Sequence, residues 1–284
     1  MTPAPQLRSG FVTLVGRPNV GKSTLLNRII GQKVSIVSDK VQTTRTQVRG
    51  VLERPGAQVV FVDTPGIHKP RSLLGRRLNE AATASLGGVD AVVLVLDAAA
   101  GVGKGDRFVA ARLPAGSVCA LNKVDGVSRR AVLSGLQAAS ELGLGEYYPV
   151  SARRGEGVEE LVEGLVGRLP EGPRLYPEGT VADVTEAVWV AELVREQLLA
   201  VTRDEVPHSI ACRVTDWDWP HVRCQILVER ESQKGIVIGR GGAVLKEVGT
   251  RVRHQLPAGA FVELVVQVDK DWQQRPQALG RLGY

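Results

Sequence analysis

The chain has 284 residues, 43% of them hydrophobic, and a formal net charge of +6, so it is long enough for two soluble domains with cores of their own. Its three cysteines, Cys119, Cys212 and Cys224, are odd in number and far apart, which argues against a disulfide framework or a zinc site and favours a reducing cytoplasm. Residues 1–10 lack the apolar stretch of a signal peptide, and no apolar run approaches the length of a membrane span. We therefore expect a cytoplasmic protein that is neither exported nor integral to a membrane.

The first motif is a glycine-containing loop between an apolar run of strand length, 11–15, and a helical pattern, 23–30. Residues 16–23 read Gly-Arg-Pro-Asn-Val-Gly-Lys-Ser, which is typical of a loop whose backbone N–H groups and following helix N-terminus face phosphates. We expect Lys22 to reach the β- and γ-phosphates and Ser23 to bind Mg²⁺; a turn without a ligand would leave both residues unexplained. The residues assigned to phosphate binding are Gly16, Arg17, Pro18, Asn19, Val20, Gly21, Lys22, Ser23 and Thr24.

A polar segment, 33–47, is expected to form a loop, and two strand-like runs follow it, 48–53 and 58–62, joined by a turn sequence. The second run ends in Asp-Thr-Pro-Gly. Its aspartate can hold Mg²⁺ through a water, and its glycine can offer an N–H to a γ-phosphate and act as a hinge. Asp-x-x-Gly alone is a common turn, but its place after a strand and downstream of the phosphate loop favours nucleotide binding. We assign that role to Asp63, Thr64, Pro65, Gly66 and Ile67.

A threonine in the polar loop is expected to cover Mg²⁺ when a γ-phosphate is present. Thr43 and Thr44 are both candidates, and the residues alone barely separate them.

Further apolar runs of strand length alternate with helical patterns up to residue 169. The runs are 91–96, 118–121 and 147–150, and the helical patterns are 72–86, 106–113, 128–142 and 158–169. This alternation predicts a mostly parallel sheet with helices on both faces, which is an α/β domain covering residues 1–169. Ligands of such domains bind at the C-terminal ends of the strands, where the phosphate loop and Asp63 both fall.

A base-reading motif follows the 118–121 strand. An aspartate carboxylate at position 125 can accept hydrogens from N1 and the 2-amino group of guanine, while Asn122 can bond the N7 and O6 edge and the Lys123 stem can lie across the ring. This pattern indicates GTP rather than ATP. Ser151, Ala152 and Arg153, after the next strand, would complete the base pocket through backbone N–H groups, although this tripeptide has low specificity alone.

Residues 170–182 are rich in Pro and Gly and suit a domain linker. The second domain, 183–284, is expected to have the order α-β-β-α-α-β. Its predicted elements are a helix with an apolar stripe over 184–201, strands at 209–214 and 222–229 around a polar turn region at 215–221, a helix-turn-helix at 235–255 and a strand at 260–268.

A glycine-rich loop, 239–242, opens the last predicted helix of this domain and fits a Gly-x-x-Gly loop that lets an RNA backbone approach its N–H groups. Residues 181–284 hold 13 Lys and Arg and 14 Asp and Glu, so this half of the chain is not basic as a whole. Residues 230–254, however, hold six Lys and Arg and only two Glu, which is a local basic patch of the kind that binds nucleic acid. Alone, a glycine-rich turn between helices is usually just a turn. The residues assigned to RNA binding are Lys234, Ile236, Val237, Ile238, Gly239, Arg240, Gly241, Gly242 and Lys246, the three aliphatic ones as a floor beside the bases.

These motifs resemble those of one known family. Residues 16–23, 42–45 (Gln-Thr-Thr-Arg), 63–68, 122–125 and 151–153 look like the five guanine-nucleotide motifs of the Era GTPases. In the second half, 191–196, 205–209, 233–239 and 270–272 are similar to the C-terminal KH domain of that family, so the resemblance spans nearly the whole chain. It selects Thr44 for Mg²⁺, beside Ser23 and Asp63, and implies a switch formed by Gln42, Thr43, Thr44, Arg45 and Gly66.

The resemblance implies a P-loop GTPase domain followed by a type II KH domain, with GTP or GDP and Mg²⁺ as ligands and GTP hydrolysis as the activity. It further implies binding to 16S rRNA near its 3′ end and a role in maturation of the 30S subunit. A monomer, K⁺ near Asn19 as a candidate cofactor, and peripheral attachment to the inner face of the cell membrane are expected on the same ground.

Two other functions remain open. Ile67 stands where many GTPases have a water-orienting glutamine, so an RNA-binding scaffold that rarely turns over its nucleotide is the alternative. A GTPase that acts in RNA modification is disfavoured because the sequence has no catalytic cysteine cluster.

Overall fold

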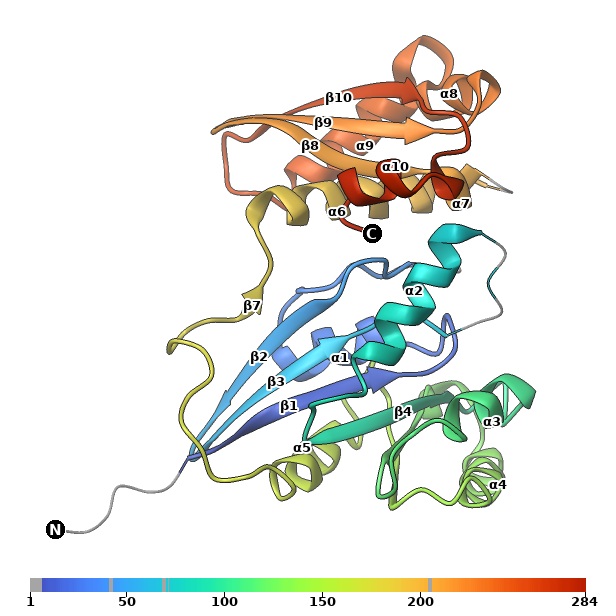
Figure 1. Cartoon of the computed structure of the whole chain (residues 1–284), viewed down its shortest axis with the longest axis vertical. Coiled ribbons are helices and arrows are strands. Elements are labelled where there is room, and N and C mark those ends of the chain that lie inside the picture. The colour runs from blue at the N-terminus through green and yellow to red at the C-terminus, as the bar shows by residue number, and fades with distance from the viewer. Residues whose placement is uncertain (1–6, 41–42, 68–69, 71, 204–205) are drawn as a thin grey trace, which may run out of the picture. The chain divides into compact units, whose positions relative to one another are not determined.

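The computed structural model describes residues 7–40, 43–67, 70, 72–203 and 206–284 (Figure 1). Contacts divide the chain into two compact units. The first comprises Met1–Ser35, Thr44–Lys69 and Leu78–Asp183, and the second comprises Ile36–Thr43, Pro70–Arg77 and Val184–Tyr284. Two short segments of the expected GTPase domain, 36–43 and 70–77, therefore group with the C-terminal residues. Each helix in the described part of the chain is too short or too polar to cross a lipid bilayer.

The first unit is a seven-stranded sheet in the order β6-β5-β4-β1-β3-β2-β7. Strands β6, β5, β4, β1 and β3 are parallel, whereas β2 and β7 run antiparallel at one edge. This is the mostly parallel sheet that the alternating pattern predicts. Its elements are β1 (Arg8–Val15), α1 (Lys22–Ile30), β2 (Val48–Arg54), β3 (Ala57–Asp63), α2 (Leu73–Ala84, in this unit from Leu78), β4 (Ala91–Asp97), α3 (Lys104–Ala110), β5 (Val118–Asn122), α4 (Arg129–Ser140), β6 (Glu146–Pro149), α5 (Val158–Val166) and β7 (Ala182–Asp183).

Helices cover both faces of this sheet, which is why its central strands are continuously apolar. In β4, Val93 and Val95 belong to the core beneath α1 and α5, whereas Val92, Leu94 and Leu96 belong to the core beneath α2, α3 and α4. All five side chains are at most 2% exposed. Alternate residues thus fill two cores, and the polar motifs are left at the C-terminal strand ends.

Most of the expected linker packs against the first unit. Gln58 of β3 is fully buried, and its side-chain oxygen accepts from the N–H groups of Leu175 and Tyr176 at 2.7 and 3.0 Å. Its amide nitrogen donates to the Tyr176 oxygen at 2.9 Å, and β7 adds a two-residue strand to the edge of β2. Proline and glycine make this stretch irregular, and the Gln58 amide supplies the partners that an irregular backbone needs.

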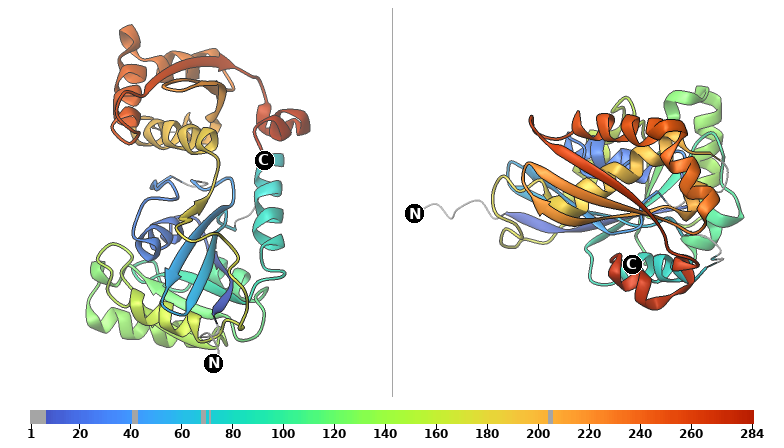
Figure 2. Two further views of the ribbon diagram at one scale, coloured as in Figure 1. Left: turned by 90° about the vertical axis from the view of Figure 1, so that its left-hand side faces the viewer. Right: turned by 90° about the horizontal axis from the view of Figure 1, so that it is seen from above.

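The second unit contains a three-stranded sheet in the order β10-β9-β8, with β9 and β10 parallel and β8 antiparallel. Side chains of α6, α8 and α9 share one apolar core with one face of this sheet, and Figure 2 shows these helices along one side of it. Its elements are α6 (Glu186–Val201), α7 (Val206–Ser209), β8 (Ala211–Asp218), β9 (His221–Val228), α8 (Glu231–Ile238), α9 (Ala243–Arg253), β10 (Phe261–Val268) and α10 (Pro276–Arg281).

The predicted turn region at 215–221 is mostly strand. Strand β8 continues to Asp218 and β9 begins at His221, so only residues 219–220 form the turn. A register shift between Val214 and Asp216 interrupts the alternation of inward and outward side chains along β8. For this reason the sequence pattern did not predict a strand at the polar end of β8. Helix α8 also begins earlier than predicted, at Glu231, and the short α7 and α10 were not predicted.

Candidate nucleotide site and nucleic-acid interface

The phosphate loop connects β1 to the N-terminus of α1. Gly21 caps the helix with φ of +98°, and a Cβ there would lie 2.4 Å from the Asn122 amide nitrogen, so the position requires glycine. Lys22 is only 6% exposed, and its ammonium group donates to the oxygen atoms of Arg17 at 3.2 Å and Gly16 at 3.4 Å. Burial lowers the pKa of Lys22, and the charge of Asp63 opposes this effect. The lysine head therefore lies within the loop that was expected to bind phosphates.

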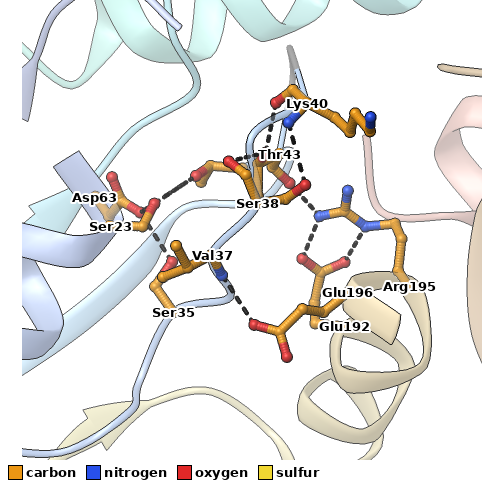
Figure 3. A network of polar contacts seen from close by, with 11 residues as sticks. Ser23, Ser35, Val37, Ser38, Lys40, Thr43, Asp63, Glu192, Arg195 and Glu196 are labelled. Atoms are coloured by element: carbon orange, nitrogen blue, oxygen red, sulfur yellow. Dashed lines mark hydrogen bonds and ion pairs between the residues drawn. The ribbon is translucent and has the colours of Figure 1, made fainter. Parts of the chain in front are cut away.

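Four oxygen-bearing side chains meet at the C-terminal end of β3, and Figure 3 labels three of them, Ser23, Ser35 and Asp63. The Asp63 Oδ2 atom accepts from Ser23 at 2.6 Å, Ser35 at 2.9 Å and Thr44 at 3.3 Å, and the Ser23 and Thr44 hydroxyls are 3.0 Å apart. Burial raises the pKa of Asp63, while the charge of Lys22 and the hydroxyl donors lower it.

This oxygen cluster fits Mg²⁺. The second carboxylate oxygen of Asp63, Oδ1, is buried without a hydrogen-bond partner among the described residues, and hydroxyl and carboxylate oxygens are the ligands that Mg²⁺ prefers. The described residues contain no cluster of three or more His, Cys, Asp or Glu side chains that could hold a metal ion, so a Mg²⁺ here would depend on hydroxyl oxygens beside a single carboxylate.

The structure separates the two candidate threonines. Thr44 is 7% exposed and lies in the oxygen cluster, whereas the Thr43 hydroxyl donates to the Lys40 oxygen at 2.7 Å. Within the second unit, Arg195 of α6 donates to the Thr43 oxygen, and Glu196 accepts from the Val37 N–H at 3.0 Å. Arg45, another predicted switch residue, is 3% exposed. Gln42, also assigned to the switch, lies outside the described residues.

The segment after Asp63 folds against the phosphate loop. A Cβ on Gly66 would lie 2.7 Å from the Pro18 nitrogen, so this glycine is needed for the close approach. The N–H of Ile67 donates to the Gly16 oxygen at 3.2 Å, and the Ile67 side chain is 6% exposed within the core under α2, α3 and α4. Ile67 therefore contributes its backbone to the site, and its side chain belongs to the apolar core.

The base-reading residues are held together by one buried amide. Asn122 donates from Nδ2 to the Val20 oxygen at 2.9 Å and accepts from the Ala152 N–H at 3.0 Å, which joins the phosphate loop to the turn after β6. Asp125 is half-buried and accepts from the Ser151 hydroxyl at 2.7 Å; this hydrogen bond is the main reason that its pKa is lowered. The carboxylate is thus ionised and oriented, as recognition of guanine requires.

Several residues that the motifs did not indicate also belong to this site. Asp97, at the end of β4, binds the Lys123 ammonium group at 2.6 Å, and Asp106 of α3 binds the Arg17 guanidinium at 2.7 Å. Asp97 could have been found from its place at a strand end. Ser35 gave no sequence signal because an isolated serine in a polar loop is unremarkable in any chain.

The glycine-rich loop between α8 and α9 has three residues with positive φ: Gly239 at +73°, Gly241 at +59° and Gly242 at +78°. Arg240, Gly241 and Lys246 are exposed, and Ile236 is 51% exposed. The prediction that Val237 contacts RNA is wrong, because its side chain is fully buried in the core of the second unit. Successive helical residues point in different directions, so the three aliphatic residues cannot all form one floor.

Comparisons with known proteins agree with this two-part organisation. Residues 11–123 match the model of a family described as 50S ribosome-binding GTPase, and residues 205–273 match the KH domain. The GTPase Era of Nocardioides sp. is 44% identical over an alignment of 306 positions, which covers 99% of this chain and 98% of the relative. The chain belongs to the Era GTPases. The GTPase Era of Mycobacterium tuberculosis is also 44% identical, over an alignment of 298 positions that covers 98% of this chain and 99% of the relative.

Two solved Era structures have the same fold over almost the whole chain. A point variant of Aquifex aeolicus Era bound to GDP.AlF4- is 37% identical with a TM-score of 0.92, and the match covers 98% of this chain and 99% of that one. Era in complex with MgGDPNP and nucleotides 1506–1542 of 16S ribosomal RNA is 36% identical with a TM-score of 0.93 and the same coverage. The fold and the family predicted from the sequence are confirmed.

Proposed function

We propose that this chain is a GTP-hydrolysing ribosome biogenesis factor that binds 16S rRNA near its 3′ end through its KH domain and assists assembly of the 30S subunit. One observation carries the proposal: a single chain combines two sites. The first is the oxygen cluster around Asp63, next to the turn that Asn122 holds and the Asp125 carboxylate that Ser151 orients. The second is the Gly239–Gly242 loop, in which Arg240 and Gly241 are exposed. The Era relative bound to MgGDPNP and 16S rRNA nucleotides supports it, since that relative matches the chain at both ends.

The geometry divides the work of hydrolysis among a few groups. Ser23, Thr44 and Asp63 would hold Mg²⁺, which when bound supplies positive charge against the β- and γ-phosphate oxygens. Lys22 is buried in the phosphate loop and would neutralise the same oxygens from the protein side. Gly66 lies close against Pro18 of the phosphate loop because it carries no side chain, and its N–H would be offered to a γ-phosphate there.

Orientation of the attacking water cannot come from the buried Ile67 side chain. We therefore expect slow hydrolysis by the free protein and faster hydrolysis when RNA or a small subunit is bound. The alternative, a scaffold whose nucleotide is rarely turned over, is favoured by the same burial of Ile67 and predicts no acceleration.

The first test measures GTP turnover by the full chain, alone and with an RNA single strand that matches the 16S rRNA 3′ end. The second measures the affinity for that RNA at fixed salt, once with GDP bound and once with a non-hydrolysable GTP analogue bound. Acceleration and tighter binding with the analogue support the proposal. Nucleotide-independent binding without acceleration would favour the scaffold, and absence of RNA binding would overturn the RNA assignment.

Four further expectations from the family resemblance belong to this proposal. We propose that the protein works in the cytoplasm as a monomer, attaches peripherally to the inner membrane face through basic surface residues, and uses K⁺ near Asn19. Light scattering tests the monomer, cosedimentation with anionic vesicles tests the membrane attachment, and turnover in K⁺ against Na⁺ tests the use of K⁺.

A further inference from the structure

Arg28 lies in the last turn of α1 and reaches across to the turn that follows β6. Its Nε donates to the Ala152 oxygen at 3.1 Å, and a second guanidinium nitrogen donates to the Arg153 oxygen. The side-chain stem lies beside Gly155, where a Cβ would be 3.6 Å from the Arg28 Cδ atom. None of the five nucleotide motifs includes Arg28.

The turn that Arg28 holds is the one expected to meet the guanine base. The Ala152 N–H lies 3.0 Å from the Asn122 side-chain oxygen, and the Ser151 hydroxyl orients Asp125. Local hydrogen bonds close the turn on itself, from Gly155 to the Ser151 oxygen at 2.7 Å and from Ser151 to the Glu156 oxygen at 2.8 Å. Those bonds fix its internal shape, whereas Arg28 ties it to α1.

Helix α1 also carries the phosphate-binding groups at its other end. Thr24 and Arg28 are four residues apart and therefore lie on the same face of the helix. Both line a cavity of about 330 Å³, together with Asn27, Gly31, Ala152 and Arg153. One helix thus joins the end of the phosphate loop to the turn that holds Ala152 and Arg153.

We propose that Arg28 is a positioning residue for guanine recognition, which it aids by holding the carbonyl oxygens of Ala152 and Arg153 so that the Arg153 N–H, which shares a peptide unit with the Ala152 oxygen, faces the O6 edge of the base. The inference rests on the assignment of that turn to the base pocket. It concerns nucleotide discrimination alone and is independent of RNA binding, so it can fail while the proposed function stands.

The experiment compares Arg28→Gln, Arg28→Lys and Arg8→Gln in the full chain. Arg8 is a matched control because it is also exposed and also donates to two backbone oxygens, those of Gly167 at 3.3 Å and Leu169 at 2.8 Å, at the opposite end of the sheet. The first readout is the dissociation rate of fluorescently labelled GDP. The second is the displacement of this labelled GDP by three competitors: GDP, IDP and the diphosphate of 2,6-diaminopurine riboside, which has an amino group in place of O6.

Arg28→Gln should release GDP about fivefold faster, which corresponds to about 1 kcal/mol. Most of the loss should appear as a weaker preference for GDP over the diaminopurine nucleotide, while the preference over IDP, which keeps O6, changes less. Arg28→Lys should recover part of the loss because lysine can still donate to one of the oxygens, and Arg8→Gln should behave as the unmodified protein. A wild-type rate in Arg28→Gln, an unchanged diaminopurine preference, or an equal effect of Arg8→Gln would overturn the proposal.

Discussion

Replacement of Asn122 by Ala should weaken both the fold and nucleotide binding, because one side chain joins three separate segments. Asn122 is 1% exposed, donates to the Val20 oxygen at 2.9 Å and accepts from the Ala152 N–H at 3.0 Å. Alanine leaves two buried backbone groups without these partners, each at a cost of about 1–3 kcal/mol. The expected loss of unfolding free energy is therefore about 2–6 kcal/mol, a large part of the roughly 5–15 kcal/mol that stabilises an ordinary domain.

The assay is urea unfolding followed by circular dichroism, together with GDP titration of the folded variant. Gln58→Ala is the matched control, since Gln58 is also a buried amide that bonds backbone groups, those of Leu175 and Tyr176, but lies among residues with no assigned role in nucleotide binding. Both variants should lose stability, and only Asn122→Ala should also lose GDP affinity. If Asn122→Ala unfolds within about 1 kcal/mol of the parent, or if Gln58→Ala loses as much GDP affinity, the bridging argument is wrong.

Three more predictions follow from individual side chains. Asp125→Asn should change the base preference from guanine to xanthine, because the carboxylate that Ser151 orients reads the hydrogens on N1 and the 2-amino group; competition between GDP and XDP measures this change. Joint replacement of Lys234 and Arg240 by Ala should lower RNA affinity and its dependence on salt while leaving GTP affinity intact, and equal loss of both affinities would mean that the RNA surface is misplaced. Burial raises the pKa of Cys119 to about 12, and Cys212 and Cys224 are buried too, so the native protein should resist a thiol reagent at mildly alkaline pH, whereas denatured protein should expose all three thiols.

The fold was predictable because its signals are local. The apolar run of β4 fills two cores with alternate residues, and a sequence can show this as a continuous hydrophobic stretch between two helical patterns. The turn at 215–221 was predicted wrongly because a strand irregularity after Val214 removes the alternation on which the prediction depends. Val237 was assigned to the wrong environment because three consecutive aliphatic residues do not reveal which one a helix turns inward.

The site residues that belong to motifs with a fixed spacing could be predicted from the sequence. The residues that support them could not. Lys22, Ser23, Asp63 and Asn122 could be named from motifs, whereas Ser35 and Arg28 act through contacts with residues far away in the sequence. Thr44 could be preferred over Thr43 only through the family resemblance, and the structure supplies the physical reason, which is that only the Thr44 hydroxyl reaches Ser23 and Asp63.

The glycines show why a motif can carry information about distant packing. Gly21 and Gly31 flank α1 and both have positive φ, at +98° and +82°, yet a Cβ on Gly31 would meet nothing within 4 Å. A Cβ on Gly21 would collide with Asn122, and one on Gly66 would collide with Pro18. Gly31 is thus needed only for the left-handed backbone conformation that ends α1, whereas Gly21 and Gly66 leave room for a neighbouring residue from another motif. The glycines therefore stand where the phosphate loop packs against the residue that ends the base-reading strand and against the Asp-x-x-Gly turn. Because each motif fits the space that another leaves, the motifs together indicate a nucleotide site more strongly than each does alone.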